Sequence, residues 1–170
     1  MRDGGVIAYP TEGVFGLGCR PDDPNAVYRI LEIKNRNPSM GLIIIASDLR
    51  QIIKWVQLSA ADIKTIINDQ KNTTWLVEKN HHAPYWVSGK HSTIAVRLIK
   101  HPIARELCMQ SKSALISTSA NVSGKKPPKN SIVLRRIFHG IVDYIVPGQC
   151  FQNTAASTIK ILKTGKILRP

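Results

Sequence analysis

Short apolar runs alternate with amphipathic segments along most of the chain. Runs bounded by Pro, Gly or Asp are typical of buried strands, whereas apolar residues at helical spacing after a Pro or Ser indicate helices. The predicted strands cover residues 5–9, 41–46, 73–77, 93–98 and 114–118. The predicted helices cover residues 25–34, 59–68 and 102–109. Strand and helix therefore alternate, which predicts an α/β fold.

The pattern changes near the end of the sequence. Two short alternating runs, residues 157–162 and 166–168, flank Lys163-Thr164-Gly165 and predict a β-hairpin. A hairpin added to alternating strands and helices makes the expected sheet mixed, with parallel and antiparallel strands. Because 170 residues fit one domain, we expect residues 1–170 to form a single α/β domain with a twisted, mixed, open sheet flanked by helices.

Charge narrows the range of partners. The chain has 24 Lys and Arg against 11 Asp and Glu, a formal net charge of +13. The excess is concentrated after residue 106, where ten basic residues accompany a single acid, Asp143. Nucleotides and RNA are therefore candidate partners, and a solvated basic surface is the alternative.

Cysteine usage and hydropathy bear on the compartment. Cys19, Cys108 and Cys150 are far apart, so they predict neither a zinc site nor a disulfide framework, and a reducing compartment is expected. No apolar run approaches the ~20 residues that a membrane span needs. We therefore expect a soluble, cytoplasmic protein with no membrane partner.

Glycines follow the first predicted strand. The segment Tyr9–Gly18 has the order G-x-x-G-x-G, beginning at Gly13, and matches neither the dinucleotide fingerprint nor the Walker loop. Two interpretations remain. The segment is a tight structural turn, or it is a ligand loop in which the backbone approaches a phosphate.

Two cations stand at the end of the helix predicted over residues 25–34. Within a helix, Lys34 and Arg36 would point about 200° apart. Pro38 disfavours a helical conformation at Asn37, so we expect the chain to unwind near Arg36 and both cations to converge on one anion. The alternative is a helix end whose cations only complement the helix dipole.

Hydroxyl and amide groups follow the apolar residues of the strand predicted at 114–118. The sequence STSAN, residues 117–121, offers short donors at a strand end, where α/β sheets bind ligands. A plain polar turn and a serine nucleophile are the alternatives, although no G-x-S-x-G elbow is present.

The strand predicted at residues 93–98 carries a cation. Thr93 and Arg97 share one face of this strand by its two-residue period. A guanidinium that rises from a sheet face beside a hydroxyl suits a carboxylate or a phosphate.

Three histidines lie in the polar segment 80–91, which is predicted to be a loop. His81 and His82 are adjacent and His91 is close in sequence, but neighbouring side chains on an extended loop point to opposite sides. Because no Asp or Cys is near, a solvated loop is the favoured interpretation, and no protein-bound metal is expected.

Taken together, these segments resemble the YrdC/TsaC family, the L-threonylcarbamoyladenylate synthases of tRNA modification. The matching segments occur in the family's order and span nearly the whole chain. They are IAYPTEGVFGLGC, KNRNPSMGLIIIA, TIAVRLIKHP, LISTSANVSG, ASTIKI and ILRP. The resemblance implies a YrdC-like fold with a large basic cavity, which agrees with the strand and helix pattern.

The resemblance also implies a nucleotidyltransferase that makes L-threonylcarbamoyl-AMP from L-threonine, bicarbonate and ATP, with release of pyrophosphate, for tRNA threonylcarbamoyladenosine modification. It assigns catalysis to Lys34 and Arg36. It assigns nucleotide binding to Lys34, Arg36, Met40, Thr93, Ser119, Asn121, Ser157 and Arg169. It assigns threonine binding to Thr11, Gly13, Arg97 and Ser117. No nucleophilic residue is needed, because a carbamate of threonine can attack the α-phosphorus directly, and Mg²⁺ is expected to enter with ATP.

The chain also departs from the family pattern. Long members have a threonine at the position of Gly13 and a histidine at that of Ile45, so threonine recognition is expected to differ in detail. The rival hypothesis is an RNA-binding module that uses the basic surface without catalysis. tRNA or other RNA, and proteins of the tRNA-modification pathway, are therefore further candidate partners.

Overall fold

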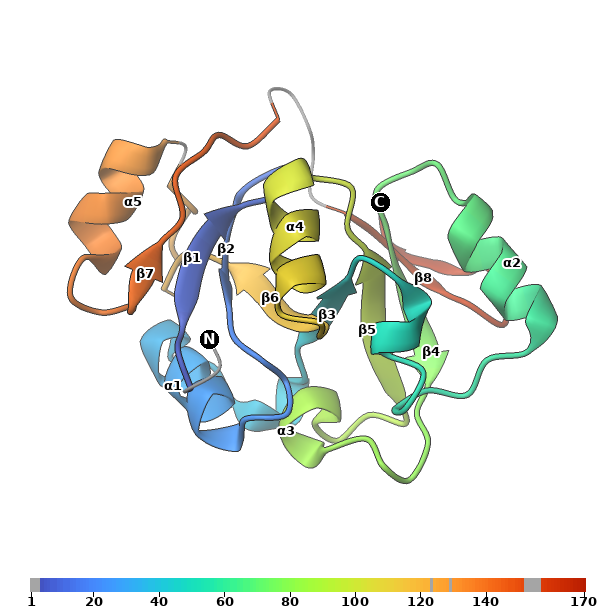
Figure 1. Ribbon diagram of the computed structural model, residues 1–170. Coiled ribbons are helices and arrows are strands. Elements are labelled where there is room, and N and C mark those ends of the chain that lie inside the picture. The colour runs from blue at the N-terminus through green and yellow to red at the C-terminus, as the bar shows by residue number, and fades with distance from the viewer. Residues whose placement is uncertain (1–3, 123, 129, 152–156) are drawn as a thin grey trace.

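Nine strands form the centre of the protein, whose computed structural model describes residues 4–122, 124–128, 130–151 and 157–170 (Figure 1). The strands are β1 (Ile7–Pro10), β2 (Phe15–Gly18), β3 (Ile43–Ala46), β4 (Thr73–Glu78), β5 (Thr93–Leu98), β6 (Leu115–Ser119), β7 (Tyr144–Ile145), β8 (Thr158–Ile161) and β9 (Ile167–Arg169). They form one sheet in the order β7-β1-β2-β6-β3-β5-β4-β8-β9. The pairs β1–β7, β3–β5 and β4–β8 are parallel, and the other neighbours are antiparallel. The mixed sheet predicted from the sequence is therefore confirmed.

Five α-helices surround the sheet in the described part of the chain. They are α1 (Pro24–Lys34), α2 (Ala60–Asn68), α3 (Tyr85–Ser88), α4 (Pro102–Gln110) and α5 (Ser131–Phe138). Single 3-10 turns, η1 (Pro38–Met40) and η2 (Leu49–Gln51), follow α1 and β3. Figure 1 shows α4 across the middle of the sheet, α5 beside β7 at one edge, and α2 near β8 towards the other. Among these helices, none is both long and apolar enough to cross a membrane.

The helix starts follow from local capping. The Asp23 side chain accepts a hydrogen bond from the Ala26 N–H, and Pro24 occupies the first turn of α1. At α2, Ser59 and Asp62 form a capping box. Because such signals are local, the sequence predicts the starts of α1, α2 and α4 to within one residue.

The two faces of the sheet are buried differently. The larger core contains Ile44 of β3 and Ile30 of α1. The smaller core lies on the opposite face, where Ile45 packs with Cys108 of α4. Ile43 is on the same face as Ile45, since alternate residues of a strand point the same way. It is only half-buried, because this part of the face borders a cavity.

The sequence does not predict β2, α3, β7 or α5. Strand β2 lies inside the glycine segment, and α3 lies inside the polar segment 80–91, whose composition favours a loop. Strand β1 also includes Pro10, one residue beyond its predicted end. Strands β2 and β7 and helix α3 have only two to four residues, which is too few for a clear periodic pattern.

Candidate active site

A cavity of about 600 Å³ borders the part of the sheet face that lies beyond the α4 core. Its floor contains Ile43, Ala95 and Ser117, which are neighbours across β3, β5 and β6. Its walls come from the β1–β2 turn, η1, the end of α3 and the β8–β9 hairpin. A volume in this range is typical of small-molecule sites.

Most of the residues predicted for the site line this cavity. The ten that do so are Thr11, Gly13, Arg36, Met40, Thr93, Arg97, Ser117, Ser119, Ser157 and Arg169. The other two, Lys34 and Asn121, are not among the lining residues and contact each other. Three arginines line the cavity together with His91, whereas no described lining residue is acidic. The arrangement suits an anionic ligand.

The turn after α1 places Arg36 at the cavity. Asn35 adopts a left-handed conformation, with φ 48°, and the Arg36 N–H donates to the Leu31 carbonyl at 2.9 Å, as in a Schellman motif. Asn37 is extended, as Pro38 predicts, but the left-handed Asn35 already ends the helix one residue before the predicted unwinding at Arg36. Arg36 Nη2 donates to the Gly41 carbonyl at 3.0 Å, and burial lowers the pKa of the guanidinium. One end of the side chain is thus fixed where it lines the cavity.

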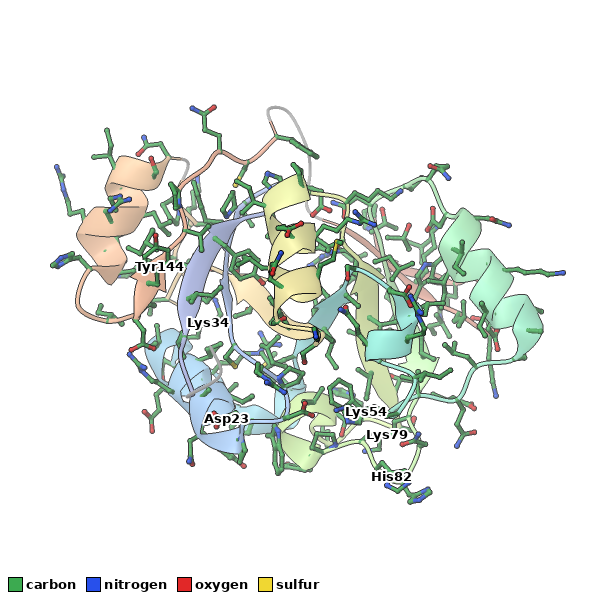
Figure 2. All side chains as sticks on the ribbon, in the orientation of Figure 1. Asp23, Lys34, Lys54, Lys79, His82 and Tyr144 are labelled. Carbon is green, nitrogen blue, oxygen red and sulfur yellow. The ribbon has the colours of Figure 1, made fainter. Side chains whose placement is uncertain are left out.

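Lys34, labelled in Figure 2, is the last residue of α1, and its side chain reaches the end of β6. Its ammonium donates to the carbonyl oxygens of Ser119 at 2.6 Å and Asn121 at 2.7 Å, and to Asn121 Oδ1 at 3.2 Å. Burial, with a smaller contribution from the charge of Arg36, lowers the pKa of Lys34 to about 8. The two cations thus bind different parts of the protein, and a phosphate contact of Lys34 stays a prediction.

Arg97 rises from β5 and is largely buried. Its Nη2 lies 3.7 Å from Glu12 Oε2, and its Nη1 donates to Asn72 Oδ1 at 3.4 Å. Burial lowers the pKa of Arg97, whereas the charge of Glu12 raises it. Because a guanidinium stays protonated in proteins, this strand contributes a fixed positive charge to the cavity wall.

The β8–β9 hairpin supplies another wall. Arg169 Nη2 donates to the Ser157 carbonyl at 2.7 Å, and the hydroxyls of Ser157 and Thr74 are 2.8 Å apart. Strand β8 pairs with β4 in parallel, so the hairpin extends the sheet beyond the cavity floor. The predicted hairpin is confirmed, and it brings Arg169 to the same cavity as Arg36 and Arg97.

The glycine segment forms the β1–β2 hairpin. A Cβ on Gly18 would overlap the Tyr9 ring and the Ile116 carbonyl, so this glycine allows close packing within the sheet. Gly13 and Gly16 line the cavity. The structural interpretation therefore holds for Gly18, while the turn itself also borders the site.

The histidine segment differs from the prediction. The ring centroids of His81 and His82 are 3.8 Å apart, so the two side chains do not point to opposite sides. The reason is a turn in which Asn80 Oδ1 accepts a hydrogen bond from the His82 N–H at 2.9 Å. Within the described residues, no group of three or more His, Cys, Asp or Glu could hold a metal ion.

Some residues of the site are not predicted from the sequence. Asn72, Leu76, His91 and Leu168 line the cavity, and Glu12 contacts Arg97 behind it. Glu12 belongs to the same YPTE segment as Thr11 and could have been found from that segment. The apolar residues carry no chemical signal that distinguishes them from core positions.

The fold and the cavity define an α/β protein with an anion-accepting site, and comparisons with known proteins give its family. The model of the Sua5/YciO/YrdC family, described as telomere recombination, matches residues 1–170. A threonylcarbamoyl-AMP synthase of Nitrosococcus oceani is 41% identical over 171 residues, which cover 99% of this chain and 92% of the relative. The chain belongs to the Sua5/YciO/YrdC family.

Solved structures of relatives share the fold. The crystal structure of P. abyssi Sua5 complexed with L-threonine matches with a TM-score of 0.89 and 30% identity, covering 99% of this chain and 51% of that protein. E. coli YciO matches with a TM-score of 0.83 and 25% identity, covering 99% and 84% respectively. This chain thus spans about half the length of the P. abyssi protein. The YrdC-like fold predicted from the resemblance is confirmed.

Proposed function

We propose that this chain condenses L-threonine, bicarbonate and ATP to L-threonylcarbamoyl-AMP and pyrophosphate, as a nucleotidyltransferase of tRNA threonylcarbamoyladenosine synthesis. The Nitrosococcus oceani relative with that synthase name supports the proposal, since 99% of this chain aligns with it. The fold shared with a relative complexed with L-threonine supports it further. A cytoplasmic location is part of the proposal.

The observation that carries the proposal is the convergence of three arginines from distant segments on one cavity. Arginine suits phosphate and carboxylate groups, because its planar donors match their geometry. We assign Arg36 and Arg169 to the nucleotide, and Arg97 with Ser117 to threonine. The other lining residues keep the roles that the resemblance implies: Met40, Thr93, Ser119 and Ser157 for the nucleotide, and Thr11 and Gly13 for threonine.

Positioning and charge stabilisation are sufficient for this reaction. The amine of threonine adds to the carbon of bicarbonate with loss of water, which gives a carbamate. A carbamate oxygen then attacks the α-phosphorus of ATP, the bond from that phosphorus to the bridging oxygen breaks, and pyrophosphate leaves. Arg36 would offset charge that develops on the transferring group. ATP would enter as its Mg²⁺ complex, with phosphate oxygens and water as the metal ligands.

Pyrophosphate release by the purified chain tests the proposal. Release should require ATP, L-threonine and bicarbonate together, and mass spectrometry should detect threonylcarbamoyl-AMP. Reactions that lack one substrate are the controls. If no adenylate forms with all three substrates and Mg²⁺, the proposal is wrong.

A further inference from the structure

Glu12 is a buried acid that lies beside the cavity without lining it. Its side chain is 5% exposed and sits in the turn between β1 and β2. Its neighbours Thr11 and Gly13 line the cavity, whereas Glu12 does not. The proposed reaction gives this carboxylate no role of its own.

One oxygen of the carboxylate anchors Glu12 to the start of α4. Glu12 Oε1 accepts hydrogen bonds from the backbone N–H groups of Lys100 at 2.7 Å and His101 at 3.1 Å. His101 is the N-cap residue of α4, and its side chain makes no capping hydrogen bond. Because β5 ends at Leu98, this anchor lies directly after the strand that carries Arg97.

The other oxygen faces Arg97. Glu12 Oε2 is 3.7 Å from Arg97 Nη2, and the Arg97 side chain is 10% exposed. Among the described residues, neither Glu12 Oε2 nor Arg97 Nε has a hydrogen-bond partner. Arg97 donates to Asn72 Oδ1 at 3.4 Å, which is long for a hydrogen bond. Within the part of the chain that the structure describes, Glu12 is the acidic partner of this guanidinium.

We propose that Glu12 is a positioning residue for Arg97. Two backbone N–H groups fix its carboxylate, which supplies the counter-charge that keeps the guanidinium oriented in the cavity wall before substrate arrives. Because the 3.7 Å pair is not a hydrogen bond, the Nη2 donors stay available to a substrate carboxylate. The inference rests on the proposed function, in which Arg97 binds threonine.

Steady-state kinetics of Glu12→Gln test this inference. Glutamine keeps an oxygen for the N–H groups of Lys100 and His101 but removes the negative charge that faces Arg97. The KM for L-threonine should rise at least about fivefold, while the KM for ATP stays within about twofold of wild type. Glu106→Gln on α4 is the matched control, because Glu106 is exposed and should show wild-type kinetics.

The same substitution made in an Arg97→Gln protein separates a positioning role of Glu12 from support of the fold. In Arg97→Gln, adding Glu12→Gln should change the threonine KM by less than about twofold, because the residue through which Glu12 acts is already altered. If Glu12 only held the start of α4, Glu12→Gln would have the same effect in wild type and in Arg97→Gln. The substitution would then also lower the melting temperature and change the KM for ATP.

Each possible result either supports or overturns the proposed role of Glu12. An unchanged threonine KM in Glu12→Gln, or equal effects in both backgrounds, overturns it. If Glu12→Gln does not fold, Glu12→Asp replaces it: a selective rise in threonine KM supports positioning, and wild-type kinetics overturn it. Wild-type protein that forms no threonylcarbamoyl-AMP overturns the proposed function, and that result is seen before any variant is made.

Discussion

Lys34 and Arg36 are two positions apart, and their side chains bind different segments of the protein. The left-handed Asn35 between them turns the chain, so Lys34 stays on the helix while Arg36 belongs to the turn at the cavity. The sequence predicts two cations at a helix end. It does not predict this division, because the partner of Lys34 at Ser119 lies 85 residues further along the chain.

At the residue scale, replacement of Arg36 by Ala should reduce catalysis far more than stability. The kcat/KM for ATP should fall at least about tenfold, because a cation beside the transferring group stabilises developing charge. The free energy of unfolding should fall by about 1–2 kcal/mol, since one hydrogen bond to Gly41 is lost. Kinetics and urea unfolding measure the two effects.

Arg36→Lys and Arg50→Ala are the comparisons for this variant. Lysine should recover part of the rate, because a point charge cannot reproduce the planar guanidinium. Arg50 is exposed and pairs with Asp48 outside the cavity, so its removal should leave kinetics unchanged. A folded Arg36→Ala protein with the wild-type rate would remove Arg36 from the catalytic machinery.

The pKa of Lys34 predicts a pH dependence of stability. Burial lowers this pKa to about 8 from the ordinary 10.5, so between these values the unfolded chain keeps a proton that the folded chain has lost. The free energy of unfolding of wild type should therefore rise with pH in this window relative to Lys34→Met, by at most about 1.4 kcal/mol per pH unit. Below pH 8 the difference should be constant. Urea unfolding of both proteins from pH 6 to 10 measures it, and a difference that falls with rising pH would contradict the prediction.

At the element scale, two glycines fix η1 against α3. Gly41 and Gly89 have φ values of 64° and 59°, and a Cβ on Gly89 would overlap the Ser39 carbonyl and the Gly41 nitrogen. The Lys90 N–H also donates to the Ser39 carbonyl at 3.0 Å. This contact holds Met40 and Gly41 where they line the cavity.

Gly89→Ala should disturb both the fold and the part of the cavity that Met40 and Gly41 line. Gly140→Ala is the matched control, because Gly140 also has a positive φ, 76°, but a Cβ there meets nothing within 4 Å. The control should lose about 1–2 kcal/mol from backbone strain alone. Gly89→Ala should lose more and should also raise the KM for ATP. Equal losses in the two variants, with an unchanged KM, would show that the η1–α3 contact does not position the site.

The elements predicted from the sequence have strong local signals, whereas β2, which is not predicted, depends on packing against other strands. Strand β5 alternates apolar residues and is predicted with its observed ends. Strand β2 contains Gly16 and Gly18, which disfavour strands, and forms because Gly18 packs against residues of β1 and β6. Helix α5 has an Asn130 cap and apolar residues at helical spacing, so the sequence does contain a signal for it.

The residues of the candidate site also include some that the sequence predicts and some that it does not. Arg97 is predicted from the period of its strand and the chemistry of its side chain. The YPTE segment draws attention to Glu12, but its contacts with Lys100 and Arg97 appear only once the β1–β2 turn packs against the end of β5. Residue type thus indicates which side chains can bind substrate. Packing determines which other residues hold those side chains in position.

At the scale of the whole molecule, the rival RNA hypothesis can be separated from the enzyme. Lys125, Lys126, Arg135 and Arg136 are exposed, and none of them lines the cavity. Their joint replacement by Glu should leave adenylate synthesis within about twofold of wild type, because screening weakens charges that lie outside the site. The same change should weaken any binding of RNA and reduce its salt dependence.

Replacement of the same four residues by Gln is the control, because it removes the positive charges without adding negative ones. Pyrophosphate release and RNA binding at two salt concentrations measure the two activities. Wild-type protein that binds RNA but forms no threonylcarbamoyl-AMP, with RNA binding lost in the Glu variant, would favour the RNA hypothesis.

The β8–β9 hairpin follows every other cavity segment in the chain, and it joins the sheet outside β4. A polypeptide that emerges from the ribosome can therefore pair its inner strands and present Arg36 and Arg97 before Ser157 and Arg169 have been made. The cavity lining is therefore completed last, by this hairpin. Nascent chains would thus lack part of the cavity lining until residues 157–169 have been synthesised, and a chain terminated before them would lack Ser157 and Arg169.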